Sequence, residues 1–147
     1  MSQPPAEKLL SFLEKRPLCA WALVAAYAAV IFAFSSMSSP PQPIETHDRL
    51  EADIISSVEH LTEYAIFGFL LLSAFRSLGG RFADRSPLLA LAAATLYGAT
   101  DEIHQYFVPN RECSITDLSV DFIGASIGIL SGKHKPPLKS SIHKTIF

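Results

Sequence analysis

The sequence has few charged residues and few cysteines. Asp, Glu, Lys and Arg make up 18% of its 147 residues, whereas a soluble domain carries about 25%. The net charge is −2, so the chain has no basic field to attract a nucleic acid. Its two cysteines form no Cys-x-x-Cys pair, which excludes a zinc ribbon and a disulfide scaffold. With 49% apolar residues and a mean hydropathy of +0.28, the composition indicates a small multi-pass membrane protein.

Four apolar runs dominate the chain, each close to the roughly 20 residues that a helix needs to cross a bilayer. We expect helices over residues 17–35, 54–75, 87–107 and 115–132. Ser86-Pro87 and the spacing of Ser114 and Asp117 are typical of helix N-termini. The predicted fold is therefore an all-α integral membrane protein with a four-transmembrane-helix bundle. The short link after the third helix makes the last two helices antiparallel neighbours.

Basic residues alternate between the segments that connect these helices. The segments before, between and after the four helices carry three, one, three, one and four Lys or Arg residues in turn. Cytoplasmic loops are enriched in Lys and Arg, so both termini are expected in the cytoplasm, as an N-terminal segment over 1–16 and a basic tail over 133–147. Cys19 and Cys113 would then lie on opposite sides of the membrane, with no disulfide between them. The first run also fits a cleaved signal peptide.

Ionisable residues inside the predicted helices lie at one level, in the outer half of the bilayer. Their spacing of three or four residues places them on shared helix faces. The candidate catalytic residues are His60, Glu63, Glu102 and His104. The candidate substrate-binding residues are Glu59, Asp101, Gln105, Arg111, Asp117 and Asp121. Burying one charged side chain in the hydrocarbon core costs a few kcal/mol. Several ionisable side chains at the same depth are therefore unlikely to be accidental, and they predict an outward-facing pocket.

Several of these residues also have a structural interpretation. Asp117 suits the N-terminus of the fourth helix, and Arg111 suits a staple that holds the link between the last two helices. Gly124 and Gly128 form a GxxxG pattern that lets another helix approach closely, including one from a second copy of the chain. The aromatic residues Tyr64, Tyr97, Tyr106, Phe107 and Trp21 are expected to serve in packing or in the interface belt of the membrane.

Histidines beside carboxylates suit a divalent cation and equally suit acid–base chemistry. The sequence contains no HExxH, GxSxG, Walker or GxGxxG motif, and the spacings match no dedicated metal site. A divalent metal is therefore one option for the pocket, and the cofactor stays open.

Three motifs carry a family resemblance. They are HLTEYAIFG from His60 to Gly68, DEIHQYFVPNR from Asp101 to Arg111, and SITDLSVDFIGASIG from Ser114 to Gly128. Together they resemble the VanZ-like family of small bacterial membrane proteins, over roughly residues 20–131. The family's usual Pro-Gly-Arg turn reads Pro-Asn110-Arg here, and asparagine tolerates a left-handed backbone.

The resemblance implies a location in the bacterial cytoplasmic membrane and a role in the cell envelope, since the founding member is linked to teicoplanin resistance. The pocket would bind an envelope lipid, a glycolipid or a lipoglycopeptide antibiotic. The alternative is a membrane-embedded enzyme that acts on a lipid-linked envelope substrate. Membrane lipids are the expected partners, and a homo-oligomer through Gly124 and Gly128 is a further expectation.

Overall fold

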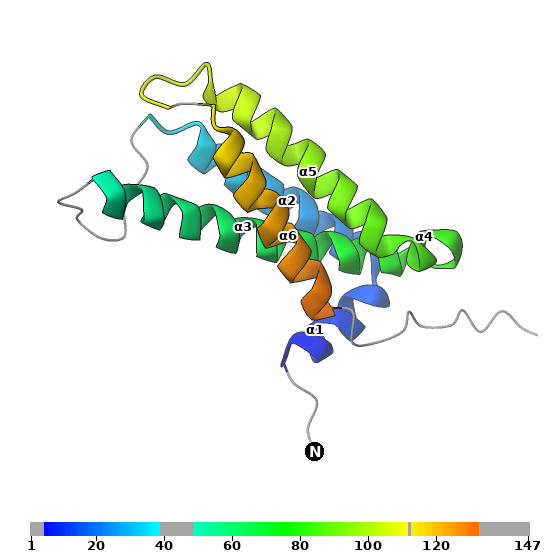
Figure 1. Cartoon of the computed structure of the whole chain (residues 1–147). Coiled ribbons are helices and arrows are strands. Elements are labelled where there is room, and N and C mark those ends of the chain that lie inside the picture. The colour runs from blue at the N-terminus through cyan, green and yellow to red at the C-terminus, as the bar shows by residue number, and fades with distance from the viewer. Residues whose placement is uncertain (1–4, 39–48, 112, 133–147) are drawn as a thin grey trace, which may run out of the picture.

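The chain is all-helical over the residues that the computed structural model describes, which are 5–38, 49–111 and 113–132, without the side chains of 5–7 and Arg49. The predicted basic tail over 133–147 lies outside them. The helices are α1 (Pro5–Glu14), α2 (Pro17–Ser35), α3 (Arg49–Ser77), α4 (Gly80–Asp84), α5 (Ser86–Gln105) and α6 (Ile115–Gly132), as Figure 1 shows.

The helices α2, α3, α5 and α6 coincide with the four apolar runs. Helix α3 is longer than its run, since it begins at Arg49, and α5 ends earlier, at Gln105. The first turn of α3 is polar and contains Glu51, whose negative charge stabilises a helix N-terminus through the helix dipole. Because this turn is not apolar, the hydrophobic pattern alone did not place it in the helix. The short helices α1 and α4 have no apolar run of membrane length, and the sequence did not predict them.

One expected helix start is displaced by a residue. Arg85, not Ser86, is the N-cap of α5, and neither side chain caps the helix. The Ser86 hydroxyl donates instead to the carbonyl of Ala83 in α4, at 2.7 Å.

The four long helices alternate in direction, and contacts along them fix the arrangement seen in Figure 1. Helix α2 is antiparallel to α3, because the ring of Trp21 packs on Phe75 and that of Tyr27 on Phe67. The Tyr97 hydroxyl of α5 donates to the Ala28 carbonyl of α2 at 2.6 Å. Helices α5 and α6 are antiparallel neighbours, as the short link between them predicts.

Helices α3 and α6 run side by side in the same direction and meet at glycines. A Cβ atom at Gly124 would collide with the backbone oxygen of Leu61, and one at Gly128 with that of Ala65. The GxxxG pattern thus provides the close approach of helices that its spacing predicts. The neighbouring helix is α3 of the same chain, so a second copy could reach this face only by displacing α3.

An aromatic and aliphatic core fills the space between the helices. Tyr64, Phe67, Leu72, Ala94 and Ile129 are all buried in it. The ring of Phe67 packs against Tyr27 of α2 and Tyr97 of α5, so one residue of α3 joins the aromatic groups of both helices.

A buried arginine ties the helices together at one end of the bundle. Arg76 Nη1 of α3 donates to the carbonyl of Gly132, the last residue of α6, at 2.8 Å. It also lies 3.4 Å from Glu14 Oε1 of α1, in a pair whose side chains are both nearly inaccessible. This arginine therefore caps α6 and holds α1 against the bundle.

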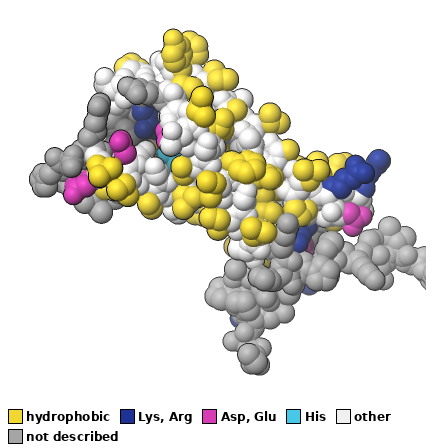
Figure 2. All heavy atoms as spheres, viewed as in Figure 1, with side chains coloured by type: hydrophobic (Ala, Val, Ile, Leu, Met, Phe, Trp, Pro, Cys, Tyr) yellow, Lys and Arg dark blue, Asp and Glu magenta, His cyan; other side chains and the backbone are white. Residues whose placement is uncertain are grey.

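The outside of the bundle is apolar. Large exposed side chains occur along every long helix, among them Leu23, Ile66, Leu96 and Ile127, and Figure 2 shows such side chains spread over the visible face. Three segments are long and apolar enough to cross a membrane: Pro17–Ser35, Leu50–Ser77 and Ile115–Gly132. Length, composition and the apolar exterior agree with a membrane protein.

The glycine contact gives a direct test of the packing. We expect Gly128→Ala to lower the free energy of unfolding by about 1–3 kcal/mol, because the new methyl group meets the backbone of α3 and not a flexible side chain. Unfolding by SDS in mixed micelles, followed by fluorescence of the single tryptophan, Trp21, measures the change. Ser119→Ala, at an exposed position of α6, is the control and should change little. Equal stability of both variants would contradict this packing.

Candidate functional site

Polar side chains from three helices meet at the end of the bundle opposite Arg76. The first half of α3, the last turns of α5 and the first turns of α6 lie together there (Figure 1). We call this group the polar centre, and its members are His60, Asp101, Glu102, Gln105 and Asp121. All five are buried.

A histidine–aspartate pair joins α3 to α6. His60 Nδ1 donates to Asp121 Oδ1 at 2.9 Å, and the Asp121 side chain is fully buried. Gly98 of α5 makes room for this carboxylate, since a Cβ there would lie 3.1 Å from Asp121 Oδ2. The pair links residues 61 positions apart, so it depends on the α3–α6 contact.

Glu102 connects α5 to the start of α6. Its Oε2 accepts the backbone N–H of Ser114 at 2.6 Å. The Ser114 hydroxyl in turn accepts the backbone N–H of Asp117 at 3.2 Å, which is the N-cap interaction predicted from their spacing. In a capping box, the acidic residue three positions after the N-cap accepts the backbone N–H of the N-cap residue. Here Glu102, which belongs to α5, accepts that N–H from Ser114.

Asp101 and Gln105 form a second contact within α5. Gln105 Nε2 donates to Asp101 Oδ2 at 3.0 Å, across one helical turn. The spacing of four residues therefore lets Gln105 hold the Asp101 carboxylate in a fixed orientation.

The polar centre retains unused hydrogen-bonding groups. Buried atoms without a partner in the described part of the chain include Asp101 Oδ1, Glu102 Oε1, Asp121 Oδ2 and the Tyr64 hydroxyl. Most buried polar atoms in proteins are hydrogen-bonded, and exceptions often mark a place for water, an ion or a ligand. The oxygens are free to accept from such a group.

His104 does not join the polar centre. Its ring stacks on Phe32 of α2, with centroids 4.6 Å apart, and Nε2 lies 3.0 Å from Ser36 Oγ. The hydroxyl proton of Ser36 is donated to the Phe32 carbonyl at 2.7 Å. Nε2 of His104 must therefore carry a proton and donate it to Ser36, on the face of α5 turned toward α2.

The other candidate residues surround the polar centre. Glu59, Glu63, Arg111 and Asp117 are half-buried. Arg111 follows Asn110, whose φ of 63° is the left-handed conformation that the sequence allows there. The Arg111 Nε atom is buried without a partner among the described residues. In Figure 2, acidic side chains and one basic side chain are visible at this end of the molecule, with a histidine between them.

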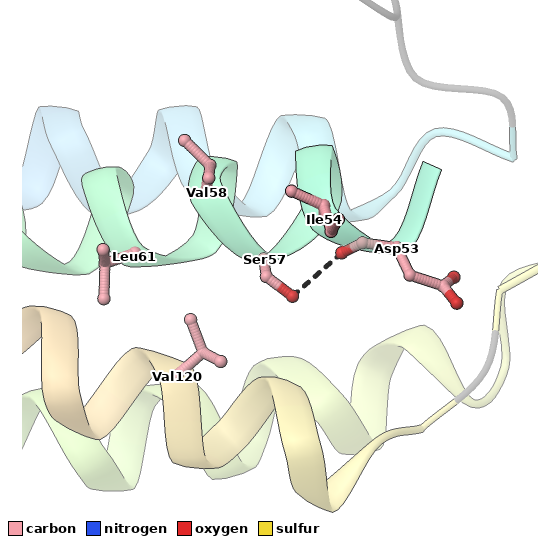
Figure 3. A pocket seen from close by; sticks show the side chains of 6 residues that line it. All are labelled: Asp53, Ile54, Ser57, Val58, Leu61 and Val120. Atoms are coloured by element: carbon pink, nitrogen blue, oxygen red, sulfur yellow. Dashed lines mark hydrogen bonds between the residues drawn. The ribbon is translucent and has the colours of Figure 1, made fainter. Parts of the chain in front are cut away.

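An apolar groove lies between α3 and α6 beside the polar centre. It is lined by Ile54, Val58 and Leu61 of α3 and by Val120 of α6, and Figure 3 shows Leu61 and Val120 pointing into the space between the two helices. The groove has a volume of about 350 Å³ and is open to the outside. Leu61 follows His60 in the sequence and Val120 precedes Asp121, so groove and polar centre occupy the same stretch of both helices.

Sequence reasoning missed two contributors to this region. The sequence predicts Tyr64 only as a packing or interface aromatic, yet its hydroxyl is buried without a partner in the described part of the chain. Its spacing of four residues from His60 places it on the same stripe of α3, and this was an available signal. The Ser114 backbone N–H, which binds Glu102, carried no signal, because side-chain patterns do not report backbone donors.

The fold and this site define a class: a small all-α membrane protein with a buried polar centre at one end of its bundle. The model of the VanZ/LLP1 family matches residues 16–134. The chain therefore belongs to the VanZ/LLP1 family, as its motifs indicated. Comparison with curated proteins and with solved structures gave no match.

The His60–Asp121 pair is expected to behave as a coupled unit. Removing one partner of a buried pair costs about 3–5 kcal/mol, because the other charge is left uncompensated. His60→Ala and Asp121→Ala should each destabilise the protein, and the double variant should lose less than the two single losses combined. SDS unfolding followed by Trp21 fluorescence measures this cycle. Glu59→Ala, at a half-buried position, is the control, and additive losses at residues 60 and 121 would argue against the pair.

Proposed function

We propose that this protein spans the bacterial cytoplasmic membrane four times, with both termini inside and the polar centre toward the outer face. The number of Lys and Arg residues alternates between high and low in successive connecting segments, and this supports the proposed orientation. Helix α5 has 20 residues, which corresponds to about 30 Å. Its polar last turns are buried against the other helices, which removes the main objection to a membrane position.

The two cysteines test this orientation. Both Cys19 and Cys113 are free and exposed, and they lie near opposite ends of the bundle. In intact cells a membrane-impermeant maleimide should label Cys113, while Cys19 should react only after permeabilisation. The variants Cys19→Ser and Cys113→Ser identify each labelled site. Labelling of Cys19 in intact cells would overturn the proposed orientation.

The function that this arrangement supports best is recognition of a polar envelope molecule that carries an acyl chain. The candidates are an envelope lipid, a glycolipid or a lipoglycopeptide antibiotic, and the role is envelope maintenance or glycopeptide resistance. The observation that carries the proposal is the set of unpartnered carboxylate oxygens on Asp101, Glu102 and Asp121. Such acceptors suit the hydroxyl and amino groups of a sugar headgroup.

The groove between α3 and α6 complements this chemistry. An acyl chain lying against Ile54, Val58 and Val120 would contact apolar side chains, and the attached headgroup would be held near the polar centre. Arg111, with a buried and unpartnered Nε, is placed to contact a phosphate or carboxylate of the same molecule.

Native mass spectrometry of protein released gently from its own membrane tests this function. We expect the wild type to retain a lipid-like molecule, and Glu102→Gln and Asp121→Asn to retain about tenfold less, the equivalent of one lost hydrogen bond to a charged group. Asp84→Asn makes the same chemical change at an exposed position in α4 and should behave as wild type. Equal retention by all four proteins would overturn the proposal.

A membrane-embedded enzyme is the second candidate. It is favoured by one observation, that the His60–Asp121 hydrogen bond resembles the orientation of a general base by a carboxylate. An enzyme using His60 as its base would lose about 10²–10⁴ in rate in His60→Gln. Chemical change of the retained molecule by the wild type alone would therefore favour catalysis over binding.

A further inference from the structure

Three side chains of the polar centre have the geometry of metal ligands. One nitrogen of His60 and one oxygen each of Glu102 and Asp121 all lie within 4.8 Å of one another. The distance between His60 Nδ1 and Asp121 Oδ1 is 2.9 Å. Adjacent ligands of a tetrahedral zinc ion lie about 3.3–3.6 Å apart, given bonds of about 2.0–2.2 Å. Small side-chain rotations would thus bring all three atoms onto one ion.

The two carboxylates have no Lys or Arg partner among the described side chains, and His60 is the one basic group paired with either of them. Glu102 and Asp121 are 2% and 1% exposed, and each has one oxygen without a partner in the described part of the chain. Burying a charge is expensive unless it is paired or coordinates a metal, so two acidic groups this close favour a cation between them.

The remaining contacts would hold the ligands in place. The second oxygen of Glu102 is fixed by the Ser114 backbone N–H, and Asp121 fits against Gly98. The three side chains also come from three different helices, so the backbone of the bundle determines their separation. Support of this kind from surrounding groups is typical of metal sites.

We propose that His60, Glu102 and Asp121 bind one divalent transition-metal cation, with Zn²⁺ as the ion that best fits one imidazole and two carboxylates. Three protein ligands leave a fourth position of a tetrahedral ion for a water molecule or an oxygen of a bound molecule. The cation takes the place of the proton between His60 and Asp121 and neutralises both carboxylates. This proposal does not depend on the lipid ligand proposed above.

Equilibrium dialysis of the full chain against Zn²⁺ tests this site. The protein is purified in detergent, stripped with a chelator, dialysed against buffered Zn²⁺ and analysed for bound metal. We expect one strongly bound ion per wild-type chain. Affinity should fall by at least about 100-fold in Glu102→Gln and Asp121→Asn, because loss of a residue that only supports a ligand already costs about 10–100-fold. These substitutions preserve size, and helix content by circular dichroism shows whether each variant is folded. Co²⁺ absorption reports a four-coordinate site in the wild type alone.

Two controls separate this site from adventitious binding. His104→Gln removes a histidine that faces Phe32 and Ser36, and Asp84→Asn removes an exposed carboxylate. Both should bind Zn²⁺ as the wild type does. The proposal is overturned if the stripped wild type binds no ion strongly, or if folded Glu102→Gln and Asp121→Asn bind as tightly as wild type.

The same samples keep the two proposals distinct. Zinc binding with no retained lipid would support the metal site and overturn the lipid-binding function. A retained lipid with no zinc binding would do the reverse.

Discussion

The contact between α3 and α6 is the constraint on which the rest of the structure depends. Gly124 and Gly128 have no side chain, so the backbone of α6 lies directly on the carbonyls of Leu61 and Ala65. His60 and Asp121 lie in the same stretch of these two helices, and the close approach brings them to 2.9 Å. A larger residue at either glycine would separate the helices and, with them, the pair. The packing of small residues therefore produces the polar centre.

The polar groups of the bundle also hold its ends together. Glu102 binds the backbone at the start of α6, and Arg76 binds the carbonyl at its end. Both satisfy backbone groups that a helix terminus leaves without intrahelical partners. Among the buried side chains that the structure describes, the carboxylate oxygens without a partner lie near the start of α6. At the opposite end Arg76 Nη1 binds Glu14 and Gly132, and the buried atom left without a partner there is a donor, Arg76 Nε. This difference is why the α3–α5–α6 end is assigned the binding role.

Much of the fold could be predicted from sequence, because apolar runs of membrane length report helices directly. The four long helices, the antiparallel α5 and α6, and the Ser114 N-cap all follow from local patterns. The missed elements are those without such a pattern. Helix α1 is held by the pairing of Glu14 with Arg76, 62 residues away, and α4 interrupts a short link. Long-range contacts of this kind leave no periodicity in the sequence.

For the site, the sequence by itself determined the position of the ionisable residues along their helices and which of them share a helix face, since rise per residue and a period of 3.6 residues give both. Only the tertiary structure decided which of them meet. His104 lies two residues beyond Glu102, yet it faces α2 and contacts Ser36, while Glu102 faces α6. Which side of a helix faces which neighbour depends on the rotation of packed helices. That rotation is set by contacts such as Gly128 on Ala65, between residues far apart in the chain.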